Sequence, residues 1–193
     1  AVACEQGGEP AIAENLYLIC ASTDANYVTP AAFGLARLRA QRQDLQGTLD
    51  ALDMVPSTSR GYLESRRLEA EHLLGFGSGL PDLQRALMAT HKARLDALTQ
   101  ARIDVDIFER ALDVVTTKGA QATVVIGDVP ATPVALRDRL ETAYRTLAVL
   151  EPLVAYVRRR QLPLTADVDL GRPEGLRRAL ATLVREGVVV EYA

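Results

Sequence analysis

The stretch LTQARIDVDIFERALDVV, residues 98–115, decides the fold class of this 193-residue chain. Its apolar residues recur at alternating spacings of three and four, the pattern of a coiled-coil seam along one face of a helix. The seam consists of Leu98, Ala101, Val105, Phe108, Leu112 and Val115. Lys118 and Gly119 follow as the cation and glycine typical of a helix end. The pattern predicts one long helix over residues 81–117.

A second stretch, residues 133–160, shows the same spacing. Its apolar positions are Leu136, Leu140, Ala143, Leu147, Leu150, Val154 and Val157. Pro152 removes one backbone hydrogen bond, so we expect a kink or a short break around Leu150. We expect the two seams to pair antiparallel within the chain. The residual face around Val105, Phe108 and Leu112 is then expected to contact another subunit.

The N-terminal half carries shorter helical signals. Thr29 and Pro30 form a typical helix opening. One apolar stripe then predicts a single helix that ends near Met54, and it consists of Leu35, Leu38, Leu45, Leu49 and Leu52. A shorter helix is predicted over residues 62–74. The β-branched residues 123–126, between two glycines, predict a strand.

These elements predict a mainly α protein, an antiparallel helical bundle with long heptad-like helices. We divide the chain into an irregular N-terminal segment (1–29), the bundle (30–162) and a small C-terminal element (163–193). The last region runs from a proline-opened helix through Gly187 into a valine strand, which resembles the core of a winged helix. No internal repeat is evident at the periods of solenoid proteins.

Composition and cysteines set limits on partners and compartment. The formal net charge of −3 does not favour non-specific attraction to nucleic acid or anionic membranes. No apolar run reaches the length of a membrane span. Cys4 and Cys20 are either two thiols or one disulfide, which would stabilise the chain by about 3 kcal/mol. Export to an oxidising compartment is compatible with the second alternative, and the sequence does not specify the localisation.

No residue pattern typical of a catalytic or metal site stands out. A phosphate-binding glycine loop, a serine elbow and a cysteine–histidine dyad are all missing. A metal site at His72 would require a second ligand four residues further on, where Phe76 stands. We therefore predict no catalytic residues, no metal and no cofactor, and we do not expect an enzyme.

The two clean seams favour a non-enzymatic helical interaction or scaffold protein, a subunit or adaptor of a larger assembly. Its expected partner is another protein or a second copy of the chain, rather than nucleic acid. The alternative is a winged-helix-like nucleic-acid-binding regulator, supported by basic residues in the C-terminal part. Those residues are Arg158, Arg159, Arg160, Arg177, Arg178 and Arg185.

Overall fold

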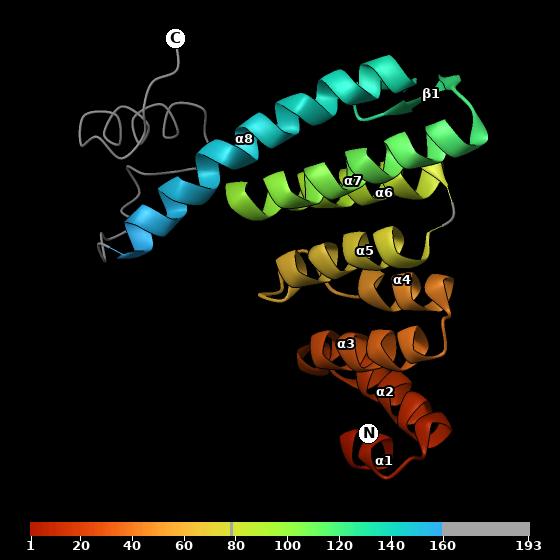
Figure 1. The fold of residues 1–193 in the computed structure, drawn as a ribbon. Helices are drawn as coiled ribbons and strands as arrows, with labels where there is room; N and C mark the ends of the chain where they lie inside the picture. The colour runs from red at the N-terminus through yellow and green to blue at the C-terminus, as the bar shows by residue number, and fades with distance from the viewer. Residues whose placement is uncertain (78, 160–193) are drawn as a thin grey trace. The chain divides into compact units, whose positions relative to one another are not determined.

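The computed structural model describes residues 1–77 and 79–159. In these ranges the chain is mostly helical with one small two-stranded sheet, which confirms the predicted mainly α fold class (Figure 1). The helices are α1 (Val2–Gln6), α2 (Pro10–Thr23), α3 (Ala25–Gln41), α4 (Leu45–Asp53), α5 (Tyr62–Phe76), α6 (Leu80–Ala93), α7 (Ala97–Lys118) and α8 (Pro133–Arg159). The strands are β1 (Gln121–Ile126), which contains the predicted strand, and β2 (Val129–Ala131).

The contacts divide the chain into two units. The first comprises Ala1–Ala93 and Val124–Asp128, and the second comprises Arg94–Thr123 and the described residues from Val129 onward. In the first unit each helix from α2 to α5 packs on the next one along the chain, so that α6 is the last helix of the series. In the second unit α7 packs along α8. These two helices are antiparallel, because Arg102 bonds Glu151 and Glu109 bonds Tyr144.

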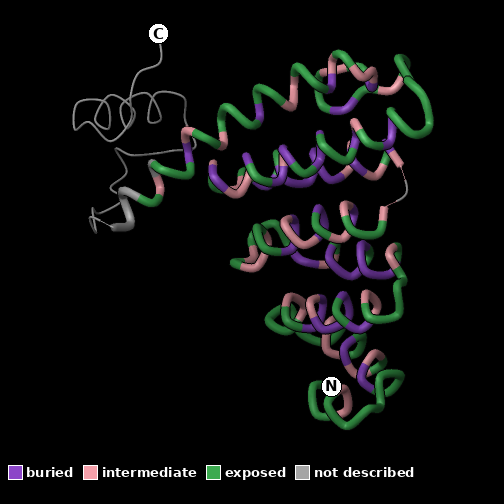
Figure 2. The backbone as a smooth tube through the Cα atoms, viewed as in Figure 1, coloured by how far each residue is buried: buried purple, intermediate pink, exposed green. Residues whose placement is uncertain are grey.

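The segment that was predicted to be irregular, residues 1–29, is helical. It forms α1, α2 and the first turn of α3, and Ala13 and Tyr17 on α2 are buried. Figure 2 shows that α1 is exposed or half-buried throughout, whereas α3 to α7 alternate buried and exposed positions. The prediction failed because α2 buries few apolar side chains, so the segment shows no long apolar stripe.

Two of the long predicted helices are each divided in the structure. The helix expected to end near Met54 is α3 followed by α4, and the helix expected over 81–117 is α6 followed by α7. Gln43 and Arg94 have positive φ values of 59° and 55°, which end the preceding helices. Asp44 and Asp96 then cap the next helices by accepting bonds from backbone N–H groups. The apolar residues before and after each turn remain in phase with the spacing of three and four. The spacing alone therefore does not reveal that each long helix is divided.

Helix α8 is continuous and includes Pro152, so the short break that was one of the two expected outcomes does not occur, and the other outcome, a kink, stays a prediction. Proline lacks an N–H group and leaves the carbonyl four residues earlier, that of Ala148, without its helical partner. Both Ala148 and Pro152 are exposed, so water can satisfy this carbonyl on the solvent side. The second seam is buried at Leu136, Ala143 and Leu150.

The predicted C-terminal element, residues 163–193, lies outside the described residues.

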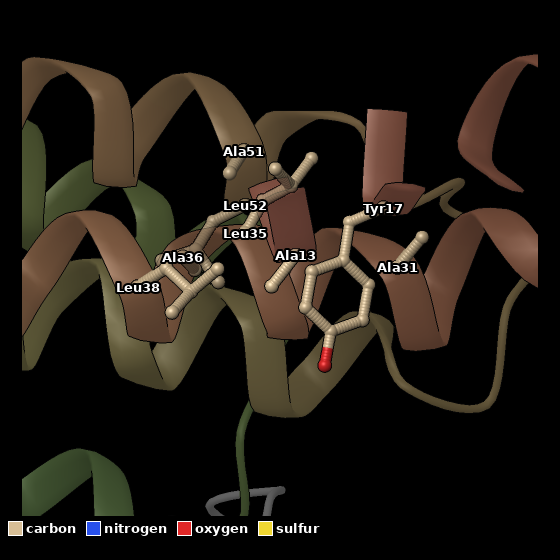
Figure 3. Close-up of a cluster of buried hydrophobic side chains, with 8 residues drawn as sticks. All are labelled: Ala13, Tyr17, Ala31, Leu35, Ala36, Leu38, Ala51 and Leu52. Carbon is tan, nitrogen blue, oxygen red and sulfur yellow. The ribbon is translucent and has the colours of Figure 1, made fainter. Parts of the chain in front are cut away.

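The core of the first unit depends on a close approach between α2 and α3. Figure 3 shows the eight buried residues of this cluster, which come from α2, α3 and α4: Ala13, Tyr17, Ala31, Leu35, Ala36, Leu38, Ala51 and Leu52. The Tyr17 ring packs over Gly34, where an added Cβ would lie 2.4 Å from its Cζ atom. A side chain at position 34 therefore cannot enter without moving the ring.

Replacement of Gly34 by alanine is expected to lower the free energy of unfolding by about 1–3 kcal/mol, because the new methyl group overpacks the Tyr17 ring. The matched control is Gly75→Ala, in an exposed part of α5 where an added Cβ meets nothing within 4 Å. That change is expected to stabilise the chain by about 0.5–1 kcal/mol. Urea unfolding of the two variants measures both effects, and equal stabilities would contradict the close packing.

Candidate functional site

An open groove of about 510 Å³ lies between α3 and α5 in the first unit. Most of its lining is apolar. The lining residues are Phe33, Ala36, Arg37, Ala40 and Gln41 of α3, with Leu68, His72 and Phe76 of α5. On both helices they recur at spacings of three or four residues, which places them on one face of each helix. We call this feature the α3–α5 groove.

The α5 side of the groove ends in an exposed aromatic pair. Phe76 is 50% exposed, and the rings of His72 and Phe76 stack with centroids 6.0 Å apart. Burial lowers the pKa of His72, against the opposing effect of Glu71. The imidazole is therefore neutral at pH 7, and it extends the apolar lining of the groove instead of adding a charge.

A second hollow of about 500 Å³ lies beside the first, among α1, α2 and α3. Arg37 lines both hollows. Its Nε and Nη2 atoms donate to the two oxygens of Glu5 at 2.6 and 2.5 Å, and the Tyr17 hydroxyl donates to Glu5 Oε2 at 2.8 Å. The bond to Arg37 lowers the pKa of Glu5, while burial and the bond to Glu5 raise the pKa of Tyr17.

A partly buried ion network holds α5 in place against α4 and α6. Arg66 on α5 donates to Asp53 at 2.7 Å and to Glu69 at 2.6 Å, and Arg85 on α6 donates to Glu69 at 2.9 Å. A further bond joins Arg66 to the carbonyl of Leu52 at 2.7 Å. The network contains two cations and two carboxylates, so its charges balance. It fixes the rotation of α5, and thus which face of α5 lines the groove.

The predicted interaction seam lies along α7 within the chain's own second unit. Leu98 and Ala101 pack with Leu150 of α8 in one buried cluster. Val105, Phe108 and Val115 are also buried, and Leu112 is half-buried. The guanidinium of Arg139 lies 4.9 Å from the centroid of the Phe108 ring. The seam residues are thus buried or half-buried within the chain, with Leu98 and Ala101 packed on α8, and contact of the seam with a second chain stays a prediction.

The remaining predicted residues fall into two groups. Cys4 and Cys20 are half-buried free thiols that pack against the cluster of Figure 3, and their disulfide stays a prediction. Arg158 and Arg159 are the last residues of α8. The other arginines proposed for nucleic-acid contact lie outside the described residues: Arg160, Arg177, Arg178 and Arg185. Nucleic-acid binding therefore stays untested.

Heptad spacing does not predict the groove residues, because it identifies the buried side chains of a single helix. The groove is formed by half-exposed faces of α3 and α5, which are separated in the chain by α4. A usable signal was present in the four-residue spacing of Leu68, His72 and Phe76 on a helix with an otherwise charged surface. The metal-site interpretation of this spacing lacks its second ligand, because Phe76 stands where that ligand is required, whereas an apolar groove accepts Phe76 directly.

Within residues 1–77 and 79–159, no cluster of three or more histidine, cysteine, aspartate or glutamate side chains is arranged to hold a metal ion. In the same ranges, no helix combines the length and apolar character that crossing a membrane requires. The α3–α5 groove, with its apolar lining and its arginine, is therefore the feature from which a function is best argued.

Comparison with known proteins agrees with a helical binding module. The family model described as protein kinase G tetratricopeptide repeat matches residues 1–161. No solved structure matches the chain.

The sequence showed no internal repeat, yet the chain matches a family of helical repeats. The helix pairs α3–α4 and α5–α6 begin at Ala25 and Tyr62, 37 residues apart, whereas tetratricopeptide repeats have a period of about 34. The two pairs also differ in length, since α4 has nine residues and α6 has fourteen. This irregular spacing hides the repeat from a search for a fixed period.

Proposed function

Because the chain belongs to the protein kinase G tetratricopeptide repeat family, we propose that it is a scaffold that binds a segment of another protein in the α3–α5 groove. Stacked helical repeats present extended surfaces that bind proteins. The observation that carries the proposal is the groove itself, with its apolar lining and the half-exposed Phe76 at its α5 side. Exposed aromatic side chains in such hollows are typical anchors of protein interfaces.

The occupant that suits this lining is a short segment presenting apolar side chains. Leu68 and Phe76 of α5 and Phe33 of α3 offer aliphatic and aromatic surface, and the neutral His72 adds no charge that an apolar side chain would have to desolvate. Domains of this repeat type are typically non-catalytic, which agrees with the prediction that the chain is not an enzyme.

The proposal includes the finer prediction that the chain is a subunit or adaptor of a larger assembly. A scaffold with one binding groove and a separate α7–α8 unit offers two surfaces for such a role. Self-association is a further prediction, and sedimentation of the full chain tests it directly. The alternative of a nucleic-acid-binding regulator finds no favouring observation among the described residues.

Replacement of Phe76 by serine is expected to weaken binding of the partner segment by about tenfold or more, because the groove loses its exposed aromatic anchor. The partner is first identified by placing a photo-reactive phenylalanine analogue at position 76 and cross-linking it in native extract. The affinity of the purified partner is then measured by calorimetry for the unchanged chain and for Phe76→Ser.

The matched control is Met88→Ser. Met88 on α6 is 62% exposed and does not line the groove, so this variant is expected to bind the partner like the unchanged chain. If both variants bind the partner equally weakly, binding depends on exposed apolar surface in general and not on the groove. A Phe76→Ser variant with full affinity would exclude the α3–α5 groove as the binding site.

A further inference from the structure

We infer that Arg37 and Tyr17 form a carboxylate-binding pair for the partner segment, and that α1 holds this pair with Glu5 until an acidic side chain of the partner replaces it. The inference rests on the proposed function, because Arg37 of this pair lines the α3–α5 groove. It adds the chemistry of the partner, an aspartate or glutamate close to apolar side chains, and a way in which the chain itself controls access.

The geometry around Glu5 shows which group this pair accepts. Two parallel bonds join the guanidinium of Arg37 to both oxygens of the carboxylate, an arrangement specific for planar anions. The Tyr17 hydroxyl donates a third bond to the same carboxylate, and Arg37 Nη2 lies 3.3 Å from that hydroxyl. A side chain of another protein with the same carboxylate can make the same three bonds.

The position of Arg37 connects this pair to the groove. Arg37 lines both the α3–α5 groove and the second hollow among α1, α2 and α3. Its side chain is 51% exposed despite the pairing, whereas that of Glu5 is only 14% exposed. A segment that lies along α3 can therefore place a carboxylate on Arg37 and apolar side chains beside Phe33 in the groove.

The helix that supplies Glu5 is weakly held. Helix α1 has five residues, and none of these described residues is buried. An isolated helix of this length is not stable in water, so α1 depends on its packing against α2 and on the Glu5 contacts. The Arg37 side of the ion pair is 51% exposed, so solvent screens its attraction for Glu5. A partner carboxylate supported by apolar contacts in the groove therefore competes well with Glu5.

The test uses the full chain and fluorescein-labelled peptides of twelve residues. Each peptide carries two leucines and one glutamate in a glycine–serine background, and the set moves the glutamate stepwise relative to the leucines. A second set has glutamine in place of glutamate. Fluorescence anisotropy measures their affinities for the unchanged chain, Glu5→Gln and Arg37→Gln.

We expect Glu5→Gln to bind the best glutamate peptide about tenfold more tightly than the unchanged chain does, because Arg37 is released. We expect Arg37→Gln to lose the preference for glutamate over glutamine. The matched control is Glu14→Gln, since Glu14 on α2 pairs with Arg39 and Arg42 at the C-terminal end of α3 but lines neither hollow. Its affinities should equal those of the unchanged chain.

Hydrogen exchange supplies a second readout. Adding the glutamate peptide to the unchanged chain is expected to speed exchange of the amides of residues 2–6, because α1 leaves its place. Equal affinities for glutamate and glutamine peptides, or α1 amides that exchange as before, would overturn the inference. If the inference fails in this way but Phe76→Ser still weakens peptide binding, the proposed function of the α3–α5 groove remains supported. Failure of Glu5→Gln to bind any peptide overturns the inference as well, while cross-linking at position 76 tests the groove separately.

Discussion

Replacement of Phe108 by alanine is expected to lower the free energy of unfolding by about 3–5 kcal/mol, the largest effect of any single apolar truncation considered. The ring on α7 is fully buried, so the change removes a large core side chain and leaves a cavity in its place. The guanidinium of Arg139 also loses the aromatic face on which it lies, 4.9 Å from the ring centroid. Chemical denaturation followed by circular dichroism measures the loss.

The matched variant is Leu112→Ala on the same seam. Leu112 is half-buried, so its truncation removes less packing and is expected to cost clearly less than the Phe108 change. Sedimentation of Leu112→Glu tests the predicted subunit contact in the same region, because a charge on a half-buried position would disrupt an interface. A Phe108→Ala variant with unchanged stability would contradict the assignment of this ring to the core.

Replacement of Glu69 by alanine is expected to destabilise the chain by about 3–5 kcal/mol, because it removes the buried partner of Arg66. The side chain of Glu69 is 3% exposed and that of Arg66 is 10% exposed, so the remaining cation loses its only buried carboxylate and keeps the exposed Asp53 and the Leu52 carbonyl as partners. Arg85 loses its bond to Glu69 at the same time. Thermal and urea unfolding measure this loss, and the α3–α5 groove should lose its peptide affinity because α5 can rotate.

Two further variants separate the buried pair from surface charge. Glu71→Ala removes a carboxylate that pairs with Arg67 on the exposed side of the same helix, and it is expected to cost only about 0–1 kcal/mol. The double variant Arg66→Met, Glu69→Leu is expected to recover most of the stability that Glu69→Ala loses, since apolar residues can replace a buried ion pair. Equal losses for Glu69→Ala and Glu71→Ala would show that the network does not hold α5.

The apolar spacing of the chain was a sound guide to helix pairing. Leu98, Ala101 and Leu150 pack together in the way that two matching seams require. The spacing was a poor guide to helix ends, because Gln43 and Arg94 interrupt helices without disturbing the apolar phase. Asp44 and Asp96 stand just after these turns as capping residues, and these two aspartates are the sequence signal that marks where each long helix divides.

The mainly α class and the α7–α8 pair could be read from the chain alone, because burial of one stripe per helix leaves a periodic record in the local sequence. The α3–α5 groove and the Glu5–Arg37–Tyr17 contact could not. Phe33 and Phe76 come from different helices, and Glu5 lies 32 residues from Arg37, so their proximity depends on how α1, α2, α3 and α5 pack. Half-exposed groove residues do not follow the regular apolar spacing that burial imposes on a helix. Ion pairs between residues far apart in the chain depend on how the helices pack, which the local sequence does not determine.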